Sequence, residues 1–271
     1  MPDKQVADLG EVQKTLFIPL SARAREARKK RPILDDPMAA EIAESTDFDV
    51  TRYGRGWGST AVVLRTAIFD AWVRRFLAEH PSGTVVEIGA GLNTRFERVD
   101  NGTVHWIDLD LPDTIRLRRK FFADSPRRRM IAASVLDERW LEAVQELPGP
   151  YFFVADGVLV YLPEDGVSRT LERIAAQFPR ALISFDTYPL QTFRRQHQMA
   201  AKRDIAQWVW ACDDPRLLER PGLRMVESTS IGRPPHPVRA QLPVRDRCLL
   251  WLAAPLLSRA LTLALFQATP D

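Results

Sequence analysis

The sequence predicts an α/β fold with a mostly parallel sheet, a helical N-terminal cap over residues 1–80 and a C-terminal helical tail. Short β-rich runs begin at residue 84 and alternate with helical stretches, which is typical of a parallel sheet buried on both faces. The first 80 residues show helical periodicity, and residues 248–266 form an apolar stretch. We expect residues 81–271 to hold the sheet and its lid and tail elements, as one structural unit with the cap.

Composition places the chain among ordinary globular proteins. Its 271 residues are 45% hydrophobic and 27% charged, which argues against global disorder. The net charge of +3 is mild, and the basic runs Arg25–Arg31 and Arg116–Arg129 are interpreted as solvated surface. No aromatic residues interleave them in a way that suggests base stacking, so no nucleic-acid partner is predicted. The two cysteines, Cys212 and Cys248, lie far apart, which excludes a thiolate metal site and argues against a disulfide framework; no metal site is predicted.

The N-terminal region predicts two helices. Asp36-Pro37 opens the first with proline at its first position. Residues 61–79 carry apolar side chains at helical period and form the second. Residues 51–60, TRYGRGWGST, are predicted to form a glycine-rich loop of a kind that often has a function. The polar N-terminus lacks the apolar core of a signal peptide, so we expect a cytoplasmic protein.

Four short runs predict the central strands, at residues 84–88, 104–108, 151–155 and 181–185. Weaker strand candidates follow at residues 130–133, 225–229 and 238–242, and prolines near the last of these favour an edge strand or a loop.

The apolar stretch Cys248–Phe266 predicts a buried helix or helix pair. Pro255, Ser258 and Arg259 interrupt it near the middle, where a membrane-spanning helix tolerates charge poorly. We therefore expect no membrane span.

A glycine motif follows the first predicted strand. Gly89 and Gly91 allow a tight turn and close approach of a ligand to the backbone. The third glycine of a dinucleotide fingerprint is missing, because Thr94 stands in its place. Glu87 precedes the glycines, and its charge disfavours a pyrophosphate but suits a cationic ligand. A plain strand-to-helix turn is the alternative interpretation.

Carboxylates end the second and fourth predicted strands. Asp108 and Asp110 both compete for a ribose diol, and Asp110 is favoured because the chain leaves the strand near Pro112. Asp156 ends the fourth strand and is expected to face the same crevice. Asp108 and Asp110 could instead cap a helix or face solvent, Asp137 after the third strand could cap the helix that follows, and Asp156 could face substrate.

Several segments, in order and at natural spacing, resemble one family. They are PILDDPMAAEI (32–42), VVLRTAIFD (62–70), EIGAGLNTRF (87–96), DLDLPDTIRLRRKFF (108–122), SVLDERW (134–140) and ADGVLVYLP (155–163). The chain is similar over residues 15–190 to the leucine carboxyl methyltransferase family, in its bacterial polyketide-type branch. This resemblance implies a class I methyltransferase with a Rossmann-like sheet, S-adenosylmethionine as cofactor, and O-methylation of a small molecule, with a carboxylic acid as the favoured acceptor.

The resemblance also implies roles for single residues. Arg65 resembles the arginine that pairs with the methionine carboxylate of the cofactor, and Arg23 the basic residue that reaches the same end. Asp110 would bind the ribose hydroxyls. The remaining cofactor-binding residues implied are Glu87, Gly89, Gly91, Leu111, Ser134, Val135 and Asp156. Ser134 stands where the family often has aspartate, and Asp156 where it usually has glutamate, so Asp156 would reach the cofactor through water.

A carboxylate acceptor is already ionised and needs no general base, whereas a phenol needs one. The candidates for a catalytic group are His197 and Tyr161, and a solvated helix face is the other interpretation of His197. The rival functions are methylation of a peptide or protein C-terminus, phenol or hydroxyl methylation, a nicotinamide-dependent enzyme and an inactive cofactor sensor. A homodimer is compatible with the sequence.

Overall fold

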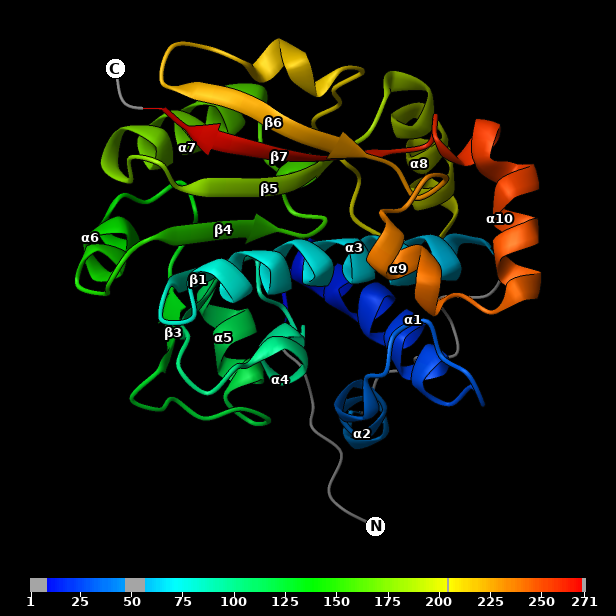
Figure 1. The fold of residues 1–271 in the computed structure, drawn as a ribbon, viewed down its shortest axis with the longest axis horizontal. Helices are drawn as coiled ribbons and strands as arrows, with labels where there is room; N and C mark the ends of the chain where they lie inside the picture. Colours follow the sequence, from blue (N-terminus) through cyan, green and yellow to red (C-terminus); the bar gives the residue numbers. More distant parts are fainter. Residues whose placement is uncertain (1–8, 47–56, 204, 270–271) are drawn as a thin grey trace.

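The computed structural model describes residues 9–46, 57–203 and 205–269 (Figure 1). Its helices are α1 (Phe17–Ala27), α2 (Pro37–Ser45), α3 (Trp57–Glu79), α4 (Arg95–Val99), α5 (Pro112–Arg118), α6 (Arg139–Gln145), α7 (Glu164–Gln177), α8 (Leu190–Arg203), α9 (His236–Gln241) and α10 (Val244–Leu257), with 3₁₀ helices η1 (Gln13–Leu16), η3 (Leu159–Tyr161) and η4 (Pro215–Leu218). Its strands are β1 (Thr84–Ile88), β2 (His105–Asp110), β3 (Arg128–Ala132), β4 (Tyr151–Ala155), β5 (Leu182–Thr187), β6 (Leu223–Thr229) and β7 (Thr262–Ala268).

These strands form one sheet in the order β3-β2-β1-β4-β5-β7-β6. The first five are parallel, and β7 pairs antiparallel with both β5 and β6. The predicted mostly parallel α/β fold is therefore confirmed. The strand order reverses between β1 and β4, and such a switch point leaves a crevice at the carboxyl ends of the strands.

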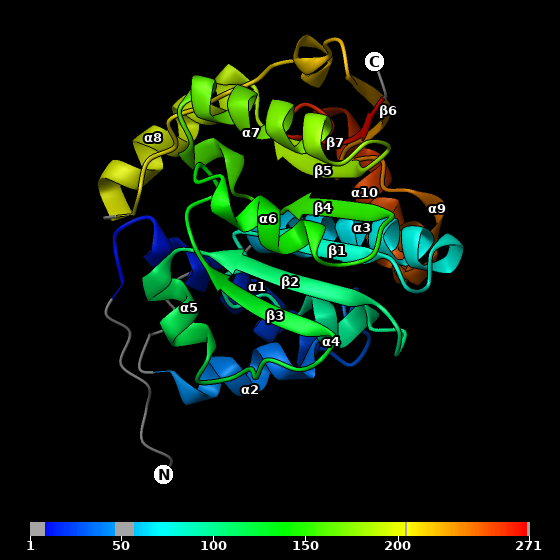
Figure 2. The same ribbon diagram turned by 90° about the vertical axis from the view of Figure 1, so that its left-hand side faces the viewer.

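Helices cover both faces of the sheet (Figure 2). Val85 and Phe152 point to the face that packs against α3, α9 and α10. Their neighbours Val86 and Phe153 point to the opposite face, against α6 and α7. Because successive strand residues enter two different apolar clusters, the central strands are mostly apolar on both faces.

The N-terminal helices reach the carboxyl end of the sheet. A third cluster joins α1 and α2 to Ile115 of α5, Met130 of β3 and Leu92 in the turn after β1. Helix α3 meanwhile shares a cluster with the sheet strands. The boundary between cap and core at residue 80 stays a prediction.

The predicted N-terminal helices are present. Asp36 caps α2, with its side chain accepting a hydrogen bond from the Ala39 N–H at 3.1 Å. Helix α3 begins at Trp57, so residues 57–60 of the predicted loop are helical. Residues 51–56 of that loop lie outside the described residues.

The prediction of a wholly helical, buried tail is wrong. Helix α10 ends at Leu257, and residues 262–268 form β7 in the interior of the sheet. A short apolar run does not by itself distinguish strand from helix. Here the run forms a strand because it pairs with the edge of β5. Most large apolar side chains of α10 are exposed and not buried. Residues 236–241 form α9, so the strand candidate at 238–242 is also wrong. None of the described helices is long and apolar enough to span a membrane.

The interpretation of Arg116–Arg129 as solvated surface is wrong for two of its arginines. Arg118 and Arg128 are buried, and both pair with Asp108, at 3.0 and 2.8 Å. Arg118 also donates to the carbonyl oxygens of Gly91 and Asn93. Asp108 is therefore a structural partner of these arginines, and Arg118 holds the turn after β1.

Replacing Arg118 by methionine is expected to lower the free energy of unfolding by about 3 kcal/mol or more, because the buried carboxylate of Asp108 loses a partner. Urea denaturation followed by circular dichroism measures this. The control is Arg129→Met, whose exposed pair with Glu146 should contribute no more than about 1 kcal/mol. Equal losses in the two variants would contradict a structural role for the buried pair.

Candidate active site

A cavity of about 590 Å³ lies at the carboxyl ends of β1, β2 and β4, at the switch point of the sheet. Its walls come from the turns after these strands, from η1 and α1, from α3 and from residues near α8. Nine of the ten predicted cofactor-binding residues line it: Arg23, Arg65, Gly89, Gly91, Asp110, Leu111, Ser134, Val135 and Asp156. The residues that line the cavity therefore come from segments far apart in the sequence.

The glycine turn forms the base of this cavity. Gly89 and Gly91 have φ angles of 64° and 47°, which side chains rarely tolerate. A Cβ atom at position 89 would lie 2.4 Å from Cγ2 of Val158. The turn thus requires glycine at Gly89, both for its conformation and for the close passage of the loop after β4.

Asp110 ends β2 at the cavity. Its side chain accepts hydrogen bonds from the N–H groups of Gly91 and Leu111, each at 2.7 Å. Burial raises the pKa of Asp110, and these two N–H groups oppose the rise. A carboxylate has about four acceptor positions, so capacity remains for a ligand beside these N–H groups and the Thr114 side chain.

Arg65 extends from α3 into the cavity wall between two carboxylates. It pairs with Asp156 at 2.6 Å and with Asp186, at the end of β5, at 3.1 Å. Its Nη1 also donates to the hydroxyl of Tyr188 at 2.5 Å. Burial lowers the pKa of Arg65, but Asp156, Tyr188 and Asp186 outweigh it and raise the pKa well above its usual value. Arg65 therefore remains a cation.

Arg23 reaches the cavity from α1. Its guanidinium donates to Asp36 at 3.0 Å and to the carbonyl oxygen of Leu92 at 2.7 Å. Burial lowers the pKa of Arg23, although Asp36 opposes this. With Arg65, it gives the cavity two buried guanidinium groups.

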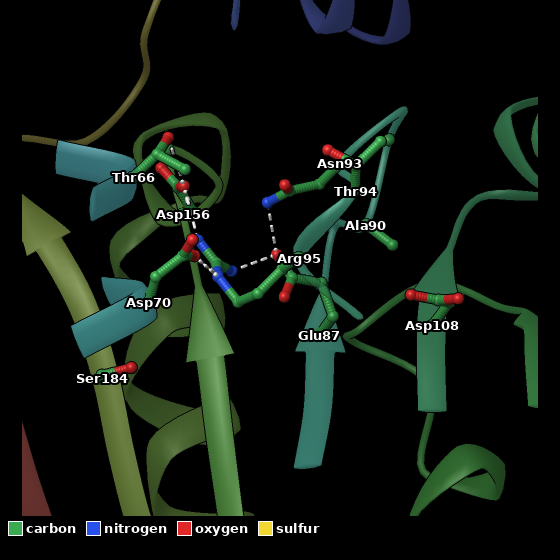
Figure 3. A network of polar contacts seen from close by, with 12 residues as sticks. Thr66, Asp70, Glu87, Ala90, Asn93, Thr94, Arg95, Asp108, Asp156 and Ser184 are labelled. Atoms are coloured by element: carbon green, nitrogen blue, oxygen red, sulfur yellow. Dashed lines mark hydrogen bonds and ion pairs between the residues drawn. The ribbon is translucent and has the colours of Figure 1, made fainter. Parts of the chain in front are cut away.

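A network of buried charges lies beneath the cavity, with Arg95 at its centre (Figure 3). Arg95 pairs with Asp70 of α3 at 2.8 Å, with Asp156 at 2.9 Å and with Glu87 of β1. Arg98, one helical turn later, also pairs with Asp70, at 2.7 Å. The network connects α3, α4, β1 and β4 by charge pairs, so these elements are held in register below the cavity.

Glu87 belongs to this network and does not line the cavity, unlike the other predicted cofactor-binding residues. One carboxylate oxygen accepts hydrogen bonds from Arg95 and from Asn93, and the other, Oε2, is buried with no hydrogen-bond partner among the described residues. Burial raises the pKa of Glu87 to about 7, against the pull of Arg95. This carboxyl group therefore titrates near neutrality.

Asp156 receives more partners than the sequence suggested. It pairs with Arg65 and Arg95 and accepts a hydrogen bond from Thr66 at 3.3 Å. Burial raises its pKa, but the two arginines outweigh burial and lower it. Asp156 is thus held as a carboxylate by the protein itself.

The two candidate catalytic groups lie in different places. Tyr161 lines the cavity, and burial raises its pKa. His197 on α8 does not line it, and its Nε2 lies 2.6 Å from the carbonyl oxygen of Trp208. The neighbouring Gln196 bonds the backbone of Ala206 and Trp208. His197 and Gln196 therefore fix the segment that carries Trp208 against the cavity.

The residues that form ion pairs and hydrogen bonds with the predicted site residues were not themselves predicted from the sequence. Arg95 and Asp70 stand inside motifs that were recognised, but a buried arginine has no signature that separates it from an exposed one. Asp186 lies at the end of β5 and Tyr188 directly follows that strand, at the same edge of the sheet as Asp156, so strand-end position was an available signal. Asp137 lies outside the cavity and pairs with exposed Arg139, in agreement with the capping interpretation.

The raised pKa of Glu87 predicts a pH dependence of stability. Because the folded protein holds this proton up to about pH 7, its stabilising contribution is complete below pH 4.5 and is lost as pH rises through 7. In Glu87→Gln this component disappears, so the difference in unfolding free energy between the two proteins should change by roughly 1–3 kcal/mol between pH 5 and 8. Urea denaturation at several pH values measures it. A difference independent of pH would contradict the assignment.

Comparison with known proteins agrees with this geometry. The model of the leucine carboxyl methyltransferase family matches residues 17–175. The tetracenomycin polyketide synthesis O-methyltransferase TcmP of Streptomyces glaucescens is 36% identical over 225 residues, which cover 81% of this chain and 83% of TcmP. The S-adenosyl-L-methionine-dependent methyltransferase dpfgK of Gibberella zeae is 29% identical, covering 83% of this chain and 84% of its own.

Solved structures share the fold at low sequence identity. A candidate methyltransferase from Thermobifida fusca superposes with a TM-score of 0.62 at 18% identity, covering 93% of this chain and 95% of its own. A duf574 family protein from Streptomyces avermitilis superposes with a TM-score of 0.58 at 14% identity, covering 92% and 97%. The match to the family model and the identity to TcmP show that the chain belongs to the leucine carboxyl methyltransferase family and is an S-adenosylmethionine-dependent O-methyltransferase.

Proposed function

We propose that the protein methylates a carboxylate of an apolar small molecule, such as a polyketide or another secondary metabolite. The observation that carries this proposal is the chemistry of the cavity wall. Among the described residues that line it there is no histidine, and its carboxylates, Asp110 and Asp156, are both held by donors of the protein. A carboxylate acceptor needs no base, whereas a phenol would find none there.

The charge beneath the cavity suits a cationic cofactor. Where S-adenosylmethionine binds, it supplies an electrophilic methyl group on a sulfonium centre. The buried network holds four arginines and five carboxylates: Arg23, Arg65, Arg95, Arg98, Asp36, Asp70, Glu87, Asp156 and Asp186. When Glu87 is ionised, the five carboxylates outnumber the four arginines, and the network carries a net charge of −1. That sign favours a sulfonium and disfavours a pyrophosphate.

Different residues of the cavity would bind different parts of the cofactor. Arg65 and Arg23 hold the methionine carboxylate, and the unused acceptor positions of Asp110 take the ribose hydroxyls. The conformations of Gly89 and Gly91 let the ligand approach the backbone. Leu111, Ser134 and Val135 lie on the adenine side, and Glu87 contributes through the field of its charge and not by contact.

The acceptor end of the cavity is mainly apolar. Trp208, Met199 and Ile205 line it with Tyr161. Because burial raises the pKa of Tyr161, its hydroxyl stays protonated and donates a hydrogen bond that orients the acceptor carboxylate. Orientation, with exclusion of water, is the main requirement of an in-line methyl transfer.

Cofactor binding is tested by calorimetric titration with S-adenosylhomocysteine. Asp110→Ala is expected to weaken binding by about tenfold or more, through loss of charge-assisted hydrogen bonds. Asp165→Ala, which removes an exposed carboxylate on α7, should bind as the wild type does. Binding of NADH, or unchanged affinity in Asp110→Ala, would contradict the proposed site.

Acceptor chemistry is tested by methyl transfer to aromatic carboxylic acids, matched phenols and short peptides with free C-termini. At saturating S-adenosylmethionine, where the titration of Glu87 does not limit cofactor binding, turnover of the acids is expected at a rate independent of pH between about 6 and 9, because the nucleophile is ionised throughout. A rate that rises with pH and is confined to phenols would overturn the carboxylate proposal. Preference for peptides would favour the rival acceptor, a peptide or protein C-terminus.

The two candidate catalytic groups should respond differently to substitution. Tyr161→Phe is expected to lower kcat/KM by about tenfold, because one orienting hydrogen bond is lost. His197→Gln should leave the pH profile unchanged, since the imidazole contacts the Trp208 carbonyl and not the cavity. A new pH dependence in His197→Gln would show that this histidine transfers a proton.

A further inference from the structure

Helix α10 presents an apolar surface to solvent. Eleven large hydrophobic residues are exposed among the described residues, and five of them lie on this helix: Val244, Leu249, Trp251, Leu252 and Leu256. Trp251 is 76% exposed, although tryptophan normally buries most of its surface. On the opposite side, Leu250 is buried and Leu257 packs on the core. The helix is therefore anchored by one side and unpartnered on the other.

Three of these five residues form one stripe with Cys248 and Pro255, and Leu249 and Leu256 lie beside it. At 100° per residue, Val244, Cys248, Trp251, Leu252 and Pro255 fall on one side of the helix, and all five are exposed. An apolar stripe of this kind on an anchored helix indicates an interaction surface, whereas single exposed apolar residues are common on any protein surface.

Basic residues are frequent in the sequence on both sides of the stripe. Five arginines and one acidic residue, Asp246, lie between residues 231 and 261, while the whole chain carries a net charge of only +3. The arginines are Arg233, Arg239, Arg245, Arg247 and Arg259, all exposed. None of them forms an ion pair with another described residue. Helices α9 and α10 lie together at the same end of the molecule in both views (Figures 1 and 2).

We propose that α10 docks the protein onto an anionic phospholipid surface. The apolar stripe enters the boundary between headgroups and acyl chains, Trp251 lies at that boundary, and the arginines contact lipid phosphates. A second copy of the chain fits the charges less well. Arg245 and Arg247 begin the helix and Arg259 follows it, so parallel or antiparallel pairing of two copies brings arginines together.

Docking would also place the cavity near the lipid. Leu261, two residues beyond Arg259, lines the cavity wall. An apolar acceptor that partitions into the membrane would then be concentrated near the enzyme. The docking proposal stands on α10 alone and does not depend on the identity of the acceptor.

Vesicle co-sedimentation of the full chain tests the proposal. We expect binding to vesicles of phosphatidylcholine with phosphatidylglycerol, weaker binding to pure phosphatidylcholine, and loss of the difference at high salt. The variant Trp251→Glu with Leu252→Glu should bind about tenfold more weakly or worse. Arg245→Gln with Arg247→Gln should lose mainly the anionic preference.

The control is Leu217→Glu, which alters a 77% exposed leucine on η4, outside the stripe. All variants are checked for wild-type affinity for S-adenosylhomocysteine, which shows that they are folded. Wild-type binding to the vesicles by the Trp251/Leu252 variant would overturn the proposal. A second result would also overturn it: the wild type binds no vesicles but is a dimer in analytical ultracentrifugation, and the Trp251/Leu252 variant is a monomer. In that case α10 would be the interface between two copies.

Discussion

The architecture of the site depends on keeping buried charges paired. Arg95 lies beneath the cavity with Asp70, Glu87 and Asp156 around it; Arg95, Asp70 and Glu87 are buried, and Asp156 borders the cavity. A buried ion without a partner would cost several kcal/mol, so the elements that carry these residues cannot shift independently. Helix α3, strand β1 and the loop after β4 are therefore positioned by the same contacts that shape the cavity floor.

The same pairing fixes the side chains at the cavity wall. Arg65 and Arg95 meet Asp156 from two sides. Arg65 in turn is fixed by Asp186 and Tyr188 before any ligand arrives. Such preorganisation spares the ligand the entropy of ordering the side chains that bind it.

The fold and much of the cavity lining could be predicted from the sequence, because β runs, glycine turns and strand-end carboxylates have local signatures. Gly89, Asp110 and Arg65 were found in that way or by resemblance. Arg95 and Arg118 were not recognised as buried, because burial of an arginine depends on carboxylates that arrive from distant segments. Residues 262–268 were assigned to a helix since apolar runs lack a period that separates strand from helix at that length. These residues form a strand because they pair with β5 and β6, and the sequence alone does not show this pairing.

The position of β7 has a consequence for how the protein is made. β7 is the last strand in the chain order but lies between β5 and β6, which pair with nothing else on that side. During synthesis, β5 therefore keeps an open edge and β6 has no place in the sheet until residues 262–268 leave the ribosome. Open strand edges invite pairing with other chains, so the nascent protein passes through an interval of aggregation risk that lasts until β7 pairs with β5 and β6.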